Sequence, residues 1–101
     1  MSYKKENLDF TEFGRLEKML AEREIPYKVL DLYDGRQLAY PNAEQPRTLV
    51  VLHSDSYGHS VGLLEMSGCL GPYDGLFGSV AGFCDAKWCY ERILADWEGR
   101  S

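Results

Sequence analysis

A hairpin pattern in the stretch YKVLDLYDGRQLAY, residues 27–40, decides the fold of this chain. Asp34-Gly35 is typical of a two-residue type I′ turn, and it separates two runs of branched and aromatic residues. We therefore predict strands over 27–33 and 36–40. The tight turn would pair Tyr33 with Arg36, Asp31 with Leu38 and Val29 with Tyr40.

The sequence after this hairpin predicts two or three more strands. The run TLVVL, residues 48–52, is apolar throughout and indicates a central strand buried on both faces. A fourth strand is expected over 61–66 and a short edge strand over 79–83. The polar loop 41–46, the turn 54–60 and the glycine-rich loop 68–75 would connect them.

Each end of the chain carries a helical pattern. Asp9-Phe10-Thr11-Glu12 reads as a capping box, with Asp9 as N-cap and Glu12 reaching back, followed by a helix to about Glu24. The apolar stripe of this helix is Phe10, Phe13, Leu16, Met19 and Leu20. A second helix should start at the cap Asp85 and run to about Trp97, with Gly99 as its stop. Its inner face would be Ala86, Cys89, Tyr90, Ile93 and Trp97.

Hairpin links without helical crossovers indicate a mainly antiparallel sheet of four or five strands in a single α+β domain over residues 1–101, with 1–8 frayed. Each helix has one apolar stripe, so the two helices should pack side by side on one sheet face. The other face would meet solvent or a partner.

The charge distribution is uneven. Residues 48–86 contain no Lys or Arg but hold Asp55, Glu65, Asp74 and Asp85, and they account for most of the net charge of −5. Such a segment has no cations for phosphates and should repel nucleic acid, which favours a basic protein surface as partner. Three cysteines without a secretion signal indicate a reducing cytoplasm, and no apolar run is long enough to span a membrane.

Four kinds of chemistry can be weighed against this binding interpretation. A zinc site from His53, His59, Cys69, Cys84 and Cys89 lacks the usual paired cysteine spacing. The glycines after Gly71 lack the lysine of a phosphate loop. A Mg²⁺ nuclease cluster of the central carboxylates would lack cations for its substrate. A small enzyme using Cys69 with His53 or His59 as base, beside the central carboxylates, stays open as an alternative. We expect no metal and no cofactor.

Several short runs resemble small accessory proteins of phages and mobile elements of gut Firmicutes. They are Ile25-Pro26-Tyr27, Leu32–Leu38, Tyr40-Pro41, Ser56-Tyr57-Gly58 and Gly62–Glu65, within a resemblance over residues 13–95. The resemblance implies a protein that blocks a host defence enzyme, as anti-CRISPR proteins do.

The leading hypothesis is a non-catalytic protein that binds a basic surface, such as that of a nucleic-acid-guided nuclease. The loop 54–59 offers an acid, an aromatic ring and an imidazole between two strands, a usual place for binding residues. A homodimer that buries the free sheet face is a further alternative. The expected contact residues are Asp31, Tyr33, Asp34, Asp55, Tyr57 and Asp74.

Overall fold

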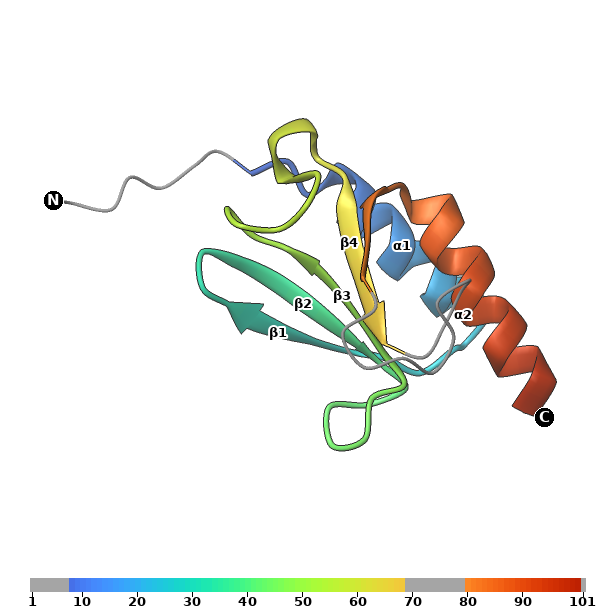
Figure 1. Cartoon of the computed structure of the whole chain (residues 1–101). Coiled ribbons are helices and arrows are strands. Elements are labelled where there is room, and N and C mark those ends of the chain that lie inside the picture. The colour runs from blue at the N-terminus through green and yellow to red at the C-terminus, as the bar shows by residue number, and fades with distance from the viewer. Residues whose placement is uncertain (1–7, 69–79, 101) are drawn as a thin grey trace, which may run out of the picture.

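The structure, a computed structural model, describes residues 8–68 and 80–100 (Figure 1). Its elements in chain order are α1 (Thr11–Glu22), β1 (Lys28–Leu32), β2 (Gly35–Tyr40), β3 (Thr48–Leu52), the 3₁₀ turn η1 (His59–Val61), β4 (Leu64–Gly68), β5 (Val80–Cys84) and α2 (Ala86–Arg100). The strands form one antiparallel sheet in the order β1-β2-β3-β4-β5. The predicted α+β class is confirmed.

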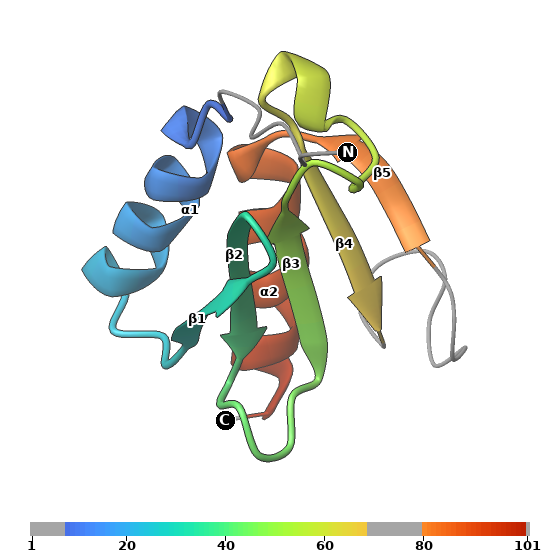
Figure 2. The ribbon, with the colours of Figure 1, turned by 90° about the vertical axis from the view of Figure 1, so that its left-hand side faces the viewer.

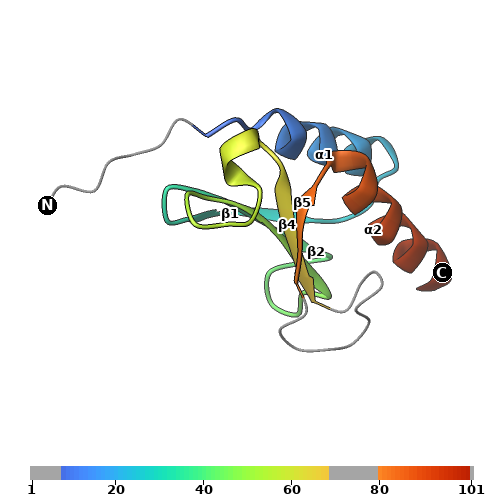
Figure 3. The same cartoon turned by 45° about the horizontal axis from the view of Figure 1, so that its top comes forward.

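Both helices cover the same face of this sheet. Cross-strand partners share a face, and Leu38, Val50 and Met66 are successive partners that are all buried. They join Phe13 of α1 and Ile93 of α2 in one core. In Figure 2 the sheet stands in front of α2 with α1 beside it, and Figure 3 shows both helices on one side of the strands. The central position predicted for 48–52 is confirmed.

The predicted hairpin register is wrong by two residues. Asp31 lies opposite Arg36 and Leu32 lies opposite Gly35, so the turn is Tyr33-Asp34 and Gly35 belongs to β2. Of the two turn residues only Tyr33 has a positive φ (56°), whereas a type I′ turn needs positive φ at both.

The reason lies in the neighbouring strand. A Cβ at Gly35 would stand 1.8 Å from the Leu52 carbonyl oxygen, so the glycine permits close approach of β3 rather than the turn. A shift by two residues keeps every side chain on its predicted face.

The predicted capping box is also wrong. The N-cap of α1 is Phe10, while the Asp9 carboxylate accepts the Thr11 N–H (2.9 Å). Glu12 does not reach back; its Oε1 accepts the N–H of Ala86, the first residue of α2, at 2.8 Å. A carboxylate on one helix thus satisfies an orphan N–H of the other and fixes where α2 begins.

The end of α1 is a Schellman motif. The N–H of Ile25 bonds to the Leu20 carbonyl, and the N–H of Glu24 bonds to the Ala21 carbonyl, with Glu24 at a left-handed φ of 56°. The buried side chains of Ile25 and Leu20 belong to the same core, as this motif favours. The helix therefore ends at Glu22, before the predicted Glu24.

Three other predicted boundaries can be compared with the structure. The segment expected to open the fourth strand forms η1 instead, between Gly58 (φ 96°) and Gly62 (φ 75°), so β4 starts at Leu64. Gly99 does not stop α2, which continues to Arg100. The predicted edge strand is confirmed as β5, which pairs with β4 only. The predicted Asp85 cap is confirmed as well, since its carboxylate accepts the Trp88 N–H at 2.8 Å.

A partly buried polar cluster joins α2 to the end of the sheet where β2 finishes. Asp96 accepts three hydrogen bonds from the Arg47 guanidinium, the shortest 2.7 Å, and one from the hydroxyl of Tyr40 at 2.7 Å. Its side chain is 11% exposed. Because burial strengthens such a bidentate pair, this carboxylate anchors the helix to the sheet.

Candidate functional site

The opposite end of the sheet brings together two segments that carry predicted contact residues. The β1–β2 turn and the loop after β3 lie side by side there in Figures 1 and 2. The Ser54 N–H donates to Asp34 Oδ1 at 3.0 Å and links the two. We call this site the acidic tip and define it as Tyr33, Asp34, His53, Ser54 and Asp55.

An aromatic pair forms the apex of the acidic tip. The Tyr33 ring meets the His53 imidazole edge to face, with centroids 5.3 Å apart. Tyr33 is 83% exposed, although a left-handed φ at a bulky residue costs about 1–2 kcal/mol. A strained and exposed tyrosine presents a large amphipathic surface to solvent, the kind of side chain that dominates binding hot spots.

Backbone hydrogen bonds hold the loop of the acidic tip in one shape. The Asp55 N–H donates to His53 Nδ1 at 3.1 Å, and the Ser56 hydroxyl bonds to the backbone of His53. Asp55 is exposed, and within residues 8–68 and 80–100 it forms no ion pair. The tip is therefore a preorganised surface with a carboxylate pointing to solvent.

The other predicted contact residues lie elsewhere. Asp31 is exposed on β1 on the helix side of the sheet, opposite Arg36, whose guanidinium lies 4.9 Å from the centroid of the Phe10 ring. Asp31 on β1 therefore has the cationic Arg36 as its cross-strand neighbour on β2. Asp74 lies outside the described residues.

Tyr57 belongs to a second exposed group at the β5 edge. Its backbone oxygen accepts the Phe83 N–H (3.4 Å), and its Cβ would be 2.4 Å from a Cβ at Gly82. Tyr57 and Phe83 are both more than 60% exposed, and Phe83 has a left-handed φ of 56°. The sequence does not predict the exposure of Phe83, because nothing in the residue order signals an exposed ring on this strand.

Two acids of the lysine-free segment 48–86 make hydrogen bonds that hold the fold. The Glu65 carboxylate accepts the Tyr57 N–H at 2.8 Å, and Asp85 caps α2. Both therefore have a structural role. Asp55 remains the exposed acid of this segment without such a role among the described residues, and Asp34 from the hairpin joins it.

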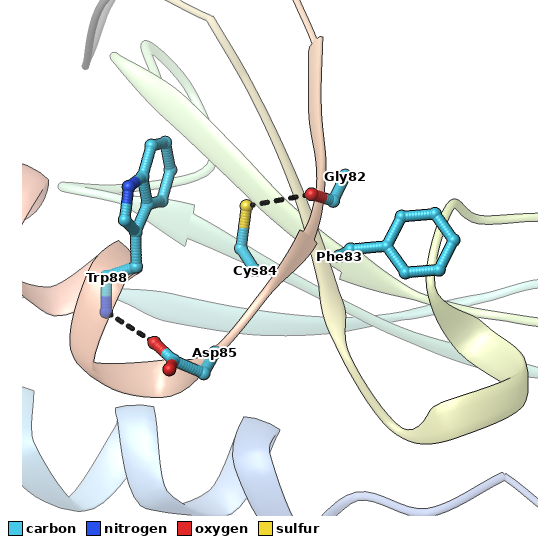
Figure 4. Close-up of a pocket in the computed structure, with 5 residues that line it drawn as sticks. All are labelled: Gly82, Phe83, Cys84, Asp85 and Trp88. Atoms are coloured by element: carbon cyan, nitrogen blue, oxygen red, sulfur yellow. Dashed lines mark hydrogen bonds between the residues drawn. The ribbon is translucent and has the colours of Figure 1, made fainter.

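The residues weighed for catalysis or metal binding are only partly described. Cys69 lies outside the described residues, so its pairing with a histidine stays a prediction. Among residues 8–68 and 80–100 no three His, Cys, Asp or Glu side chains gather to hold a metal ion. A shallow pocket of about 200 Å³ lies at the start of α2 (Figure 4). It is lined by Gly82, Phe83, Cys84, Asp85 and Trp88.

No helix in the described part of the chain is both long and apolar enough to cross a membrane. Comparison with known proteins finds no matching family model, no similar curated protein and no similar solved structure. The likeness to mobile-element proteins therefore stays a hypothesis, and function has to be argued from the geometry of the site.

Proposed function

We propose that this chain is a non-catalytic binding protein that docks on a basic protein surface through the acidic tip. The observation that carries the proposal is the strained, exposed Tyr33 packed against His53 beside the Asp34 and Asp55 carboxylates. An aromatic anchor flanked by carboxylates suits an arginine-rich surface, because guanidinium groups pair with carboxylates and stack on rings.

The rigidity of the acidic tip supports binding rather than a passive loop. Hydrogen bonds to Asp34, His53 and Ser56 fix its backbone before any partner arrives. A preformed surface loses less conformational entropy on association, so more of its contact energy appears as affinity.

A narrower form of the proposal concerns the class of the partner. A nucleic-acid-guided nuclease of the host has a basic channel, and carboxylates placed where phosphates would lie could mask it. The resemblance to mobile-element proteins motivates this form. If this narrower form holds, the chain should compete with a guide RNA for binding to such a nuclease. Docking on a basic surface outside the channel would give no competition.

Neutralising the acidic tip tests the proposal. The double variant Asp34→Asn and Asp55→Asn removes two charges, and the amide oxygen introduced at position 34 can still accept the Ser54 N–H. With a synthetic Arg-Gly repeat peptide as probe, we expect affinity by fluorescence anisotropy to fall about five-fold at low salt. The difference should shrink as salt screens the charges.

The matched control removes two charges elsewhere. Glu22, in the last turn of α1, and Glu44, in the loop after β2, are both exposed, so Glu22→Gln with Glu44→Gln makes the same change in net charge. This control should keep nearly the full affinity. Equal losses in both double variants would reduce the binding to an effect of net charge and overturn the proposal.

A homodimer is the second candidate function. Leu30 and Val80, on the helix-free face at opposite edges of the sheet, are each 37% exposed, and a second copy could cover them. Light scattering should then give twice the monomer mass, and Leu30→Lys should return it to the monomer. A monomer at high concentration would rule this candidate out.

A further inference from the structure

Two cysteines meet where β5 runs into α2. Cys84 ends β5, Asp85 is the N-cap and Cys89 lies in the first turn of α2, so the cysteines occupy the N′ and N4 positions whose side chains pack together in a hydrophobic staple. Both cysteines are free and buried in the same core. The Cys84 thiol donates to the carbonyl oxygens of Ala81 (3.3 Å) and Gly82 (3.4 Å). The fold therefore places two reduced cysteines, five positions apart in the sequence, beside the start of α2.

The two thiols differ in access. Cys84 lines the shallow pocket, and Figure 4 shows its sulfur on the same side of the strand as Trp88. Cys84 is itself only 6% exposed, whereas Cys89 is fully buried in the core and does not line the pocket. A small reagent entering the pocket would meet the sulfur of Cys84 first.

The two thiols also differ in acidity. The neighbouring Cys89 thiol lowers the pKa of the Cys84 thiol, and the nearby Arg92 guanidinium acts in the same direction, while burial and the Asp85 carboxylate oppose them. The neighbouring Cys84 thiol, together with burial, raises the pKa of Cys89. The N-terminus of α2 adds a positive potential beside Cys84. Because Cys84 lines the pocket and Cys89 lies behind it at the N4 position, Cys84 is assigned as the nucleophile and Cys89 as the resolving thiol.

We propose that Cys84 and Cys89 form a thiol–disulfide exchange site that accepts small disulfides such as oxidised glutathione. The Cys84 thiolate attacks one sulfur of the small disulfide, whose S–S bond breaks. One thiolate leaves and takes up the proton that Cys84 lost, and Cys84 retains the other half as a mixed disulfide. Cys89 then attacks the Cys84 sulfur, gives its proton to the second departing thiolate and closes the intramolecular disulfide. Two protein thiols are oxidised, and one small disulfide is reduced to two thiols.

The experiment uses the full chain carrying Cys69→Ser, so that only the proposed pair can react. After incubation with oxidised glutathione, we expect mass spectrometry to find a protein lighter by two hydrogens, with no glutathione attached and no free thiol. Adding Cys89→Ser should stop the reaction at one glutathione on Cys84. Adding Cys84→Ser instead should slow glutathione uptake roughly ten-fold or more, because the remaining thiol is fully buried and does not line the pocket.

Two results would overturn the proposal: a Cys69→Ser protein that keeps both thiols or carries two glutathiones, or a Cys84→Ser variant that reacts as fast as its parent. Wild-type protein provides a check that does not depend on how the serine variants fold. Under limiting iodoacetamide, peptide mapping should find Cys84 alkylated well before Cys89, and the reverse order would also contradict the assignment.

Discussion

Asp96, at the end of the sheet where β2 finishes, is enclosed by Arg47 and Tyr40, whereas Asp55, at the other end, faces solvent. Both are aspartates held at the margin of one sheet. Asp96 has a guanidinium in bidentate contact and is almost covered. Asp55 uses its backbone N–H to fix His53 and leaves its carboxylate outside.

The difference indicates which end of the molecule serves stability and which is available to a partner. A partly buried ion pair matters to the fold because removing one partner leaves the other charge uncompensated where water only partly reaches it. An exposed carboxylate contributes little to stability, since water solvates it in both states. The strained Tyr33 beside the exposed carboxylate reinforces the contrast, because strain at an exposed ring does not help the fold.

The largest expected effect comes from a change that breaks the acidic tip. Gly35→Ala would place a Cβ against the Leu52 carbonyl and force β2 away from β3. We expect urea denaturation to show a loss of about 3–4 kcal/mol in the free energy of unfolding. Gly14→Ala, in α1 with open space around it, is the control and should stabilise the protein by about 1 kcal/mol. A neutral Gly35→Ala would refute the close approach of the strands.

The second largest loss of stability is expected at the opposite end of the sheet. Asp96→Ala leaves the guanidinium of Arg47 and the buried hydroxyl of Tyr40 without their shared acceptor. Because the Arg47 side chain is 35% exposed, water offsets part of the cost, and we expect a loss of about 2–3 kcal/mol by urea denaturation. Asp96→Asn, which keeps an acceptor, should lose less. Equal losses in the two variants would argue against the ion pair.

A smaller effect sharpens the comparison at the tip end itself. Asp85 lies at the same end of the sheet as the acidic tip, yet its carboxylate caps α2. Asp85→Ala should cost about 1 kcal/mol of stability, measured by thermal and urea unfolding, and Asp85→Ser should recover most of it. If Asp85→Ala left stability unchanged, the cap would not hold the helix start.

The smallest effect on stability belongs to the acidic tip. Asp34→Asn with Asp55→Asn should change the free energy of unfolding by less than about 0.5 kcal/mol, since the Ser54 N–H keeps an acceptor and Asp55 is exposed. The same variant should bind the Arg-Gly peptide more weakly. A large loss of stability would show that Asp34 and Asp55 hold the fold together, as Asp96 does, and would contradict their assignment to partner binding.

The sequence predicts the layers of this fold well because they follow from apolar periodicity. The stripe Phe13, Leu16 and Leu20 lies in the core as expected, and the run 48–52 is buried except for the half-buried Leu49. What it could not predict depends on neighbours distant along the chain. From the local sequence Gly35 is predicted as a turn residue, but in the fold it permits the close approach of Leu52. Glu12 is likewise predicted as a local cap, but in the fold it accepts the Ala86 N–H of the second helix.

The candidate site follows the same division. Tyr33, Asp34 and Asp55 could be named from turn chemistry and charge, since such residues favour exposed loops. The packing of Tyr33 against His53 and the hydrogen bond from Ser54 to Asp34 join segments 20 residues apart, and no local pattern encodes them. The predicted cap at Asp85 already places Cys84 and Cys89 at the N′ and N4 positions, so their proximity follows from the helix start alone.

The most direct test of the account is an amide NMR titration of the full chain with the Arg-Gly peptide, repeated at rising salt. The account predicts that the largest shift changes gather at Tyr33, Asp34, Ser54 and Asp55 and fade as salt increases. Shift changes spread evenly over the acidic surface, or centred on Glu22 and Glu44, would contradict it.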